Sequence, residues 1–146
     1  MRIERSALVV HNAGEMYRLV HDVAAYPEFL RWCTHAEVHE QSQTLQLATL
    51  GISVAGIEQQ FKTRNRLDPG RGLAMELEEG PFRSLSGEWR FRPLGDDGSK
   101  VLLRLEFDFR PGLISTAFER GFRGIADHMV SEFVKRAHQL YGSDDE

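Results

Sequence analysis

The sequence predicts an α+β fold in which a curved antiparallel sheet of about six to seven strands wraps around a long C-terminal helix. Three observations lead to this prediction. Hydrophobic and polar residues alternate with a period of two through most of residues 36–110, as in strands with one buried face. A wide apolar stripe with a helical period follows that region. A strand and an amphipathic helix precede it, and this order of elements is typical of a helix-grip architecture.

The first residues are predicted to form a strand followed by a helix. The strand, within residues 1–10, ends in four consecutive apolar residues. Asn12 and Glu15 then have the spacing of a capping box, the side-chain arrangement that starts a helix. The apolar stripe of this helix is formed by Met16, Leu19, Val20 and Val23. Pro27 is expected to end the helix or to begin a short second one.

Strands then follow one another up to residue 110, separated by turn sequences. A hairpin is expected across residues 40–43, and the Asp-Pro-Gly of residues 68–70 and the Gly-Asp-Asp-Gly of residues 95–98 are typical of tight turns. Gly80-Pro81 breaks another strand. The residues predicted to face the core are Ile57, Phe61, Leu67, Leu73, Met75, Leu77, Leu85, Gly87, Trp89, Phe91, Val101, Leu103, Leu105, Phe107 and Phe109. This long alternation predicts an antiparallel meander with one buried face.

The C-terminal helix is predicted to follow Pro111-Gly112 and to extend to about Tyr141. Its apolar positions form a stripe that is too wide for a solvent-facing helix and suits a helix lying across a sheet. Gly121 and Gly124 within it indicate close packing or a slight bend. Residues 1–142 are expected to form one domain, and residues 143–146 a short acidic tail.

Composition limits the partners and the compartment. The net charge of −4 argues against a protein that coats nucleic acid, so that no DNA partner is expected. Of the 18 basic residues 15 are arginines, which suit fixed contacts to carboxylates or phosphates, so that a local basic patch is compatible with the net charge. The single cysteine, Cys33, and the lack of a signal-peptide core predict a cytoplasmic protein.

Several motifs resemble those of one protein family. Residues 26–33, Tyr-Pro-Glu-Phe-Leu-Arg-Trp-Cys, resemble the Tyr-Pro-x-Phe-Leu-Pro-Trp-Cys signature of the coenzyme Q-binding and RatA-like family, with Arg31 in place of the second proline. Residues 61–65 resemble its Phe-x-Thr-Arg-Asn strand, and residues 80–91 its Gly-Pro-Phe and Leu-x-Gly-x-Trp-x-Phe block. The C-terminal helix of the family is matched at Phe133, Arg136-Ala137 and Tyr141-Gly142. The match runs nearly end to end.

The resemblance implies a START-like fold within the polyketide cyclase/dehydrase superfamily, and two alternative functions. Some members bind ubiquinone and support respiration, which implies a quinone or lipid carrier in transient contact with the inner membrane or with respiratory enzymes. Members that resemble RatA are ribosome association toxins that bind the large subunit and hinder subunit joining. The cyclase chemistry of the superfamily is a weaker third alternative. No cofactor is expected to be required, and a ubiquinone-like lipid is the ligand that the first alternative implies.

A pocket between the sheet and the C-terminal helix is the predicted ligand site. Its expected lining combines inward residues of the strands and of the C-terminal helix with the segment around Pro27, which is interpreted as a flexible lid over the site. These residues are Tyr26, Phe29, Leu30, Trp32, Phe61, Met75, Leu77, Phe82, Trp89, Phe107, Phe118, Phe122 and Met129. The alternative is that these side chains fill the core at normal density, and that those around Pro27 form a cluster that fixes the short helix.

Two polar residues share the inward face of one strand. Thr63 and Asn65 lie between Phe61 and Leu67 in the alternation, so that burial would leave them in need of hydrogen-bond partners. A quinone carbonyl is one such partner, and neighbouring strands or backbone groups are the alternative.

The outward strand faces carry the predicted ribosome contacts, which are Arg64, Arg66, Arg90, Arg92 and Arg104. Acidic residues alternate with them on the same faces, so that a solvated surface with cross-strand ion pairs is the alternative. No metal site is predicted, because Cys33, His35 and His39 do not form a complete ligand set, and these histidines together with His128 and His138 are interpreted as surface residues. The inward faces offer no nucleophile motif and no acid–base pair, which favours a binding protein over an enzyme.

Overall fold

One antiparallel sheet of seven strands dominates the structure, a computed structural model that describes residues 1–112 and 114–142. The strands are β1 (Arg2–Val9), β2 (Cys33–Gln41), β3 (Leu45–Val54), β4 (Ile57–Asp68), β5 (Gly72–Glu79), β6 (Phe82–Leu94) and β7 (Gly98–Phe109). The helices are α1 (Ala13–His21), the 3-10 helix η1 (Val23–Glu28) and α2 (Thr116–Tyr141). The predicted α+β fold is confirmed, and the predicted acidic tail lies outside the described residues.

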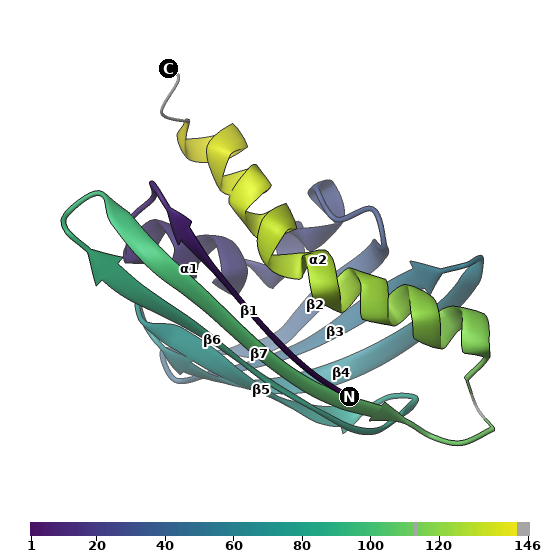
Figure 1. Cartoon of the computed structure of the whole chain (residues 1–146). Helices are drawn as coiled ribbons and strands as arrows, with labels where there is room; N and C mark the ends of the chain where they lie inside the picture. Colours follow the sequence, from purple (N-terminus) through teal and green to yellow (C-terminus); the bar gives the residue numbers. More distant parts are fainter. Residues whose placement is uncertain (113, 143–146) are drawn as a thin grey trace.

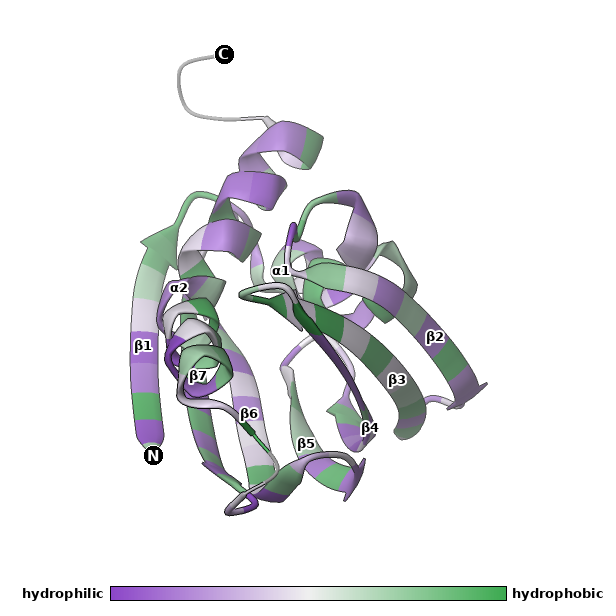
Figure 2. Cartoon of the chain, turned by 90° about the vertical axis from the view of Figure 1, so that its right-hand side faces the viewer, coloured by the Kyte–Doolittle hydropathy of each residue, from purple (hydrophilic) through white to green (hydrophobic). Residues whose placement is uncertain are grey.

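The sheet is curved, and α2 crosses its concave face (Figure 1). The strand order is β1-β7-β6-β5-β4-β3-β2, so that β2 to β7 form a meander and β1 pairs with β7. α1 and η1 cover the same face near the C-terminal part of α2 (Figure 1). Hydrophobic and hydrophilic residues alternate along the strands (Figure 2), the pattern that buries one face under the helices and exposes the other.

The core consists of two clusters of buried side chains. The first lies under α1, η1 and the C-terminal part of α2, and it includes Trp89 and Phe133. The second lies under the N-terminal part of α2 and includes Phe82 and Phe118. Met75 packs against both clusters. The middle of the concave face is therefore the place where the two clusters meet.

Side-chain caps define where the two α-helices begin. The Asn12 side chain accepts the Glu15 N–H at 2.8 Å, and the Glu15 carboxylate accepts the Asn12 N–H at 3.1 Å, which confirms the predicted capping box. Ser115 caps α2 by accepting the N–H of Phe118. Pro27 lies inside η1, so that it forms part of a short second helix.

Close packing of α2 on β3 depends on Gly121. A Cβ atom at this position would lie 2.0 Å from Val54 Cγ1, whereas a Cβ atom at Gly124 would meet nothing within 4 Å. Val54 is buried, and its branched side chain has few alternative rotamers. Gly121 therefore provides the close approach that the sequence indicated, and Gly124 has no such role.

Replacing these two glycines with alanine is expected to change stability in opposite directions. Gly121→Ala should lower the free energy of unfolding by about 1 kcal/mol, because the cost of overpacking exceeds the gain in helix propensity. Gly124→Ala should raise it by about 0.5–1 kcal/mol, since only the propensity changes. Urea denaturation of both variants measures the two shifts, and shifts of the same sign would contradict the assigned role of Gly121.

Candidate functional site

A cavity of about 70 Å³ lies between the sheet and α2, where the two core clusters meet. Its wall combines side chains of β3 to β7 with side chains of α2 and of the segment from η1 to Trp32. The lining residues are Val23, Tyr26, Trp32, Ala48, Leu50, Phe61, Thr63, Asn65, Met75, Leu85, Trp89, Leu105, Phe122, Ile125 and Met129. The wall is mainly apolar, and Thr63 and Asn65 are the polar side chains that the strands contribute to it.

The structure brings many of the predicted pocket residues together in this wall. Those that line the cavity are Tyr26, Trp32, Phe61, Thr63, Asn65, Met75, Trp89, Phe122 and Met129. Those that pack in or against the second core cluster instead are Leu77, Phe82, Phe107 and Phe118. Leu30 is fully buried in the first cluster, and Phe29 lies at a groove on the surface. The cavity thus occupies only the middle of the concave face.

Several lining residues were not predicted for this role. They are Val23, Ala48, Leu50, Leu85, Leu105 and Ile125. Leu85 and Leu105 belong to the predicted inward register and to the second core cluster, and only their position along the strands places them at the cavity as well. Ala48 and Leu50 lie on β3, in the uncharged stretch from residue 41 to 57, where the alternation is too weak to assign a face.

Asn65 and Thr63 are buried, with 3% and 5% of their surface exposed. Asn65 Nδ2 donates to Gln46 Oε1 at 2.9 Å, so that a neighbouring strand supplies a partner for the amide nitrogen. Gln46 Nε2 in turn donates to the His21 carbonyl oxygen and to Gln41 Oε1, each at 2.9 Å. Asn65 Oδ1 is buried and has no hydrogen-bond partner among the residues that the structure describes.

The segment from η1 to Trp32 covers one side of the cavity. Tyr26 and Trp32 line it, and the Tyr26 hydroxyl donates to the Val20 carbonyl oxygen. The ring centroids of Tyr26 and Phe29 lie 5.2 and 5.3 Å from that of Phe133 on α2. These aromatic contacts pack the segment against α2.

Burial raises the pKa of Tyr26 above its ordinary value, and the negative charges that Cys33 and Asp22 can carry increase this effect. Below about pH 10 the phenol is protonated in both the folded and the unfolded state, so that its contribution to stability is complete. Above that pH only the unfolded state loses the proton. The free energy of unfolding should therefore fall by about 1.4 kcal/mol per pH unit on account of this residue.

Urea denaturation between about pH 8 and pH 11 tests this effect of Tyr26. The matched variant Tyr26→Phe lacks the ionising group, so that its stability should decrease less steeply with pH. Its stability at pH 8 should be lower by about 1 kcal/mol, because the hydrogen bond to the Val20 carbonyl is lost. Equal slopes in the two proteins would contradict the assignment.

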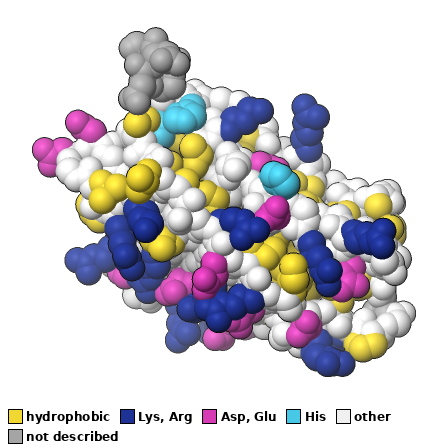
Figure 3. Space-filling model, in the orientation of Figure 1, with side chains coloured by type: hydrophobic (Ala, Val, Ile, Leu, Met, Phe, Trp, Pro, Cys, Tyr) yellow, Lys and Arg dark blue, Asp and Glu magenta, His cyan; other side chains and the backbone are white. Residues whose placement is uncertain are grey.

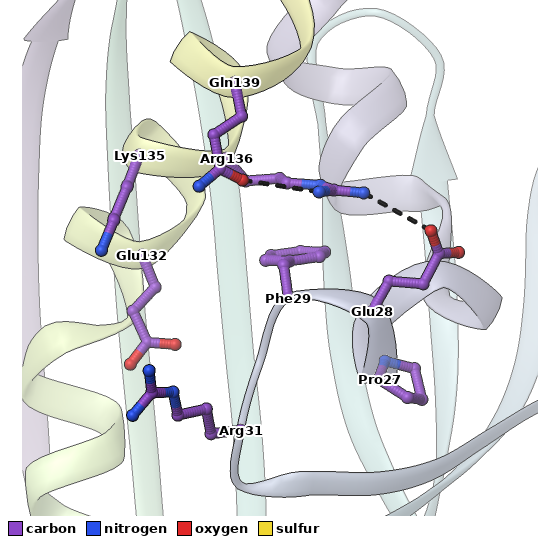
Figure 4. A pocket seen from close by; sticks show the side chains of 8 residues that line it. All are labelled: Pro27, Glu28, Phe29, Arg31, Glu132, Lys135, Arg136 and Gln139. Atoms are coloured by element: carbon purple, nitrogen blue, oxygen red, sulfur yellow. Dashed lines mark hydrogen bonds and ion pairs between the residues drawn. The ribbon is translucent and has the colours of Figure 1, made fainter.

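A groove of about 590 Å³ opens on the surface between the η1 segment and the C-terminal half of α2 (Figure 4). The Arg136 guanidinium lies 5.1 Å from the centroid of the Phe29 ring and donates to Glu28 at 3.5 Å. The Arg31 side chain points towards Glu132 on α2 (Figure 4). Arg31, which stands where the family resemblance implies proline, therefore lies at this groove and not in the cavity wall.

The arginines predicted to contact the ribosome lie on the outward face of the sheet, and most of them form ion pairs. The pairs and their N–O distances are Arg64–Glu78 (2.9 Å), Arg66–Glu76 (3.7 Å), Arg90–Asp68 (3.0 Å), Arg90–Glu88 (3.0 Å) and Arg104–Glu88 (3.6 Å). Basic and acidic side chains are also interspersed on the face that carries α2 (Figure 3). Much of the surface therefore agrees with the alternative of a solvated face with cross-strand ion pairs.

Arg92 differs from the other four arginines. It forms no ion pair with any residue that the structure describes. In the strand register it lies opposite Lys100 on β7, and Lys100 lies opposite Leu8 on β1, which is 74% exposed. We refer to Leu8, Lys100 and Arg92 as the Arg92 row. Two cations and one exposed apolar side chain thus lie side by side at one end of the sheet.

Neither a metal site nor a membrane span is present within residues 1–112 and 114–142. No three His, Cys, Asp or Glu side chains there come together in a way that could hold a metal ion. No helix there is long and apolar enough to cross a membrane. His11, which the sequence did not suggest as a candidate ligand, is buried, and its Nε2 lies 2.9 Å from His138 Nδ1.

Comparison with known proteins identifies a matching family model, similar relatives and a similar solved structure. Residues 9–134 match the family model described as polyketide cyclase / dehydrase and lipid transport. The ribosome association toxin RatA of Vibrio cholerae serotype O1 is 46% identical over 141 residues, which cover 97% of this chain and 98% of that protein. RatA of Pseudomonas aeruginosa is 43% identical over 140 residues, which cover 96% and 97%. The crystal structure of the Zhui aromatase/cyclase from Streptomyces sp. R1128 has a TM-score of 0.82 at 22% identity and covers 95% of this chain and 94% of that one.

A more distant relative is named for coenzyme Q binding, the first of the two functions that the family resemblance implied. The mitochondrial coenzyme Q-binding protein COQ10 of Drosophila melanogaster is 25% identical over 142 residues, which cover 94% of this chain and 59% of that protein. Sequence similarity is therefore much greater to RatA of Vibrio cholerae and of Pseudomonas aeruginosa than to this relative named for coenzyme Q.

Proposed function

Because the chain belongs to the polyketide cyclase / dehydrase and lipid transport family, we propose that it acts within this family as a protein that binds the large ribosomal subunit and hinders subunit joining. The observation that carries the proposal is the 46% identity to a protein named ribosome association toxin RatA. This identity extends over 97% of the chain, so that it concerns the surface of the domain as well as its core.

The Arg92 row is the surface that we propose for contact with ribosomal RNA. Phosphate groups attract cations, and binding releases the counterions that surround the nucleic acid. An arginine that already pairs with a carboxylate has to give up that ion pair to bind a phosphate, whereas Arg92 does not. The exposed Leu8 adds an apolar contact beside the two cations. A local site of this kind is compatible with the net charge of −4.

Sedimentation through sucrose gradients with separated ribosomal subunits tests the proposal. The protein is expected to travel with the large subunit and not with the small one. Binding should weaken as salt is raised, because phosphate contacts contribute to it. Addition of the protein to free subunits should also reduce the fraction that joins into whole ribosomes. Protein that stays at the top of the gradient even at low salt would overturn the proposal.

A second candidate function, binding of a hydrophobic small molecule, is favoured by the apolar cavity. Its volume of about 70 Å³ is well below the roughly 300–1,000 Å³ of typical ligand sites, so that a ubiquinone-like lipid requires the cavity to widen. The segment from η1 to Trp32 is a short connection in the wall that, unlike the strands, is not part of the sheet, and we propose that it moves to admit a ligand.

Extraction of the purified protein with organic solvent, followed by mass spectrometry, tests this second function. A stoichiometric apolar molecule is expected, and adding it back should raise the melting temperature by mass action. The matched variant Ala48→Leu fills part of the cavity and should lose the ligand while it retains the fold. A clean extract from gently purified protein, with no stabilisation by added apolar molecules, would overturn this candidate.

We infer a binding protein and not an enzyme from the chemistry of the cavity wall. Among its lining residues Tyr26 is the one with an ionisable side chain. Its pKa is raised by burial and its hydroxyl donates to a backbone carbonyl, so that it is poorly suited to proton transfer near neutral pH. Aromatase/cyclase chemistry, named for a structural neighbour, finds no acid–base group here to support it.

A further inference from the structure

The hydrogen bonds around Asn65 determine the orientation of its side-chain amide. The His21 carbonyl oxygen can only accept, so that the group of Gln46 facing it at 2.9 Å must be the NH₂. Both hydrogens of this NH₂ are used, because Gln46 Nε2 also donates to Gln41 Oε1. The Oε1 atom of Gln46 therefore faces Asn65 and requires a donor.

Asn65 has to supply that donor. Its Nδ2 lies 2.9 Å from Gln46 Oε1, and the opposite orientation of the amide would place two oxygen atoms against each other. The orientation of Asn65 is thus determined by a chain of contacts that begins at a backbone carbonyl. Asn65 Oδ1 is the atom left over, buried and without a partner among the described residues. Such unpaired acceptors are uncommon in protein interiors and call for an explanation.

We propose that the ligand of the cavity is an apolar molecule with a hydroxyl or N–H group that donates a hydrogen bond to Asn65 Oδ1. Asn65 is 3% exposed and belongs to the cavity wall, so that a ligand in the cavity is in a position to reach this atom. The proposal rests on the second proposed function, the binding of a hydrophobic molecule, and it names the chemical class of that molecule.

An alcohol or a phenol fits this wall best. A hydroxyl group can donate to Asn65 Oδ1 and at the same time accept from the hydroxyl of Thr63, which lines the same cavity. A quinone, ketone or ether carries only acceptors, so that it leaves Asn65 Oδ1 unpaired. The quinone carbonyl that the sequence suggested as a partner can therefore accept from Thr63 or from the second N–H of Asn65 Nδ2, but it cannot satisfy Asn65 Oδ1.

Phenol and anisole form a matched pair of probes for this proposal. They differ by one methyl group, and anisole, which cannot donate, is the more apolar of the two. Titration of the labelled protein, followed by NMR shifts of the cavity residues, gives the dissociation constant of each probe. We expect phenol to bind at least about tenfold more tightly than anisole, although transfer from water alone would favour anisole.

Variants of the cavity wall show which side chain causes the preference for phenol over anisole. Asn65→Leu should abolish the preference for phenol or reverse it in favour of anisole, because the acceptor is gone and transfer from water favours the more apolar probe. Thr63→Val removes the neighbouring hydroxyl but leaves the acceptor, so that most of the preference for phenol should persist. Ala48→Leu should weaken both probes together, since it fills space in the same cavity. The comparison of the probes on the unmodified protein remains decisive if Asn65→Leu fails to fold.

The outcomes distinguish failure of the proposed role of Asn65 from failure of the ligand-binding function. Equal affinity for phenol and anisole, or a preference for phenol that survives Asn65→Leu, would overturn the role of Asn65 and leave binding of hydrophobic molecules intact. If neither probe shifts the resonances of the cavity residues, the ligand-binding function itself is wrong, and the role of Asn65 is wrong with it.

Discussion

Replacing Phe133 with alanine is expected to lower the free energy of unfolding by about 3–5 kcal/mol. Phe133 is 1% exposed, and its ring centroid lies 5.2 Å from that of Tyr26 and 5.3 Å from those of Phe29 and Trp89. It therefore joins α2 to the η1 segment and to β6 at the same time. Loss of the ring removes the contacts that hold these three elements together.

The void left by this substitution is not expected to collapse. Tyr26 and Trp89 also line the existing cavity of about 70 Å³, so that the space vacated by Phe133 adds to an opening already present. A residual void increases the cost of a large-to-small substitution. The same change should loosen the η1 segment, and backbone amides there should exchange hydrogen faster.

Urea denaturation followed by circular dichroism measures the effect of Phe133→Ala. The control is Leu140→Ala on the same helix, where the side chain is 51% exposed, and the expected loss is no more than about 0.5 kcal/mol. If Phe133→Ala lowers the free energy of unfolding by less than about 1 kcal/mol, the packing of Phe133 between α2 and the η1 segment contributes much less to stability than the structure indicates.

The strands could be predicted from the sequence because their alternation is long and consistent. Along β7 every second residue from Val101 to Phe107 faces inward and is apolar. The outward residues Arg104, Glu106 and Asp108 are charged. One slip in register would bury these charges, so that a single face assignment is strongly favoured. The turn between β3 and β4 lacked such a signal, since Ala55 adopts a φ of 53° there although alanine is not typical of that conformation.

The cavity could be predicted only in part, because its limits depend on the curvature of the sheet. Leu105 and Phe107 are neighbours on the same inward face of β7 and both belong to the second core cluster, yet only Leu105 also lines the cavity. Nothing in the local pattern distinguishes the two. The partner of Asn65 is Gln46 on another strand, and the contact that orients Gln46 comes from the backbone of α1. Polar networks of this kind arise from tertiary structure and leave no periodic signal.

Reversing the charge at position 92 is expected to weaken binding to the large ribosomal subunit by about tenfold at low salt. Arg92→Glu removes one cation from the Arg92 row and places a carboxylate where a phosphate is proposed to lie. The slope of the logarithm of the binding constant against the logarithm of salt concentration should also decrease by about one. Sedimentation with large subunits over a range of salt concentrations provides both quantities.

Arg64→Glu is the matched control for this substitution. It changes the net charge by the same amount and lies on the same outward face, but the Arg64 guanidinium is already paired with Glu78 at 2.9 Å. Long-range electrostatic repulsion would weaken binding equally in the two variants, whereas a specific contact at the Arg92 row predicts a much larger loss for Arg92→Glu. Equal losses would therefore remove the Arg92 row as the contact surface while leaving ribosome binding itself in place. Because Arg92 lies on the face of the sheet opposite α2, neither variant should alter the affinity of the cavity for phenol, and a change there would mean that the two sites are coupled.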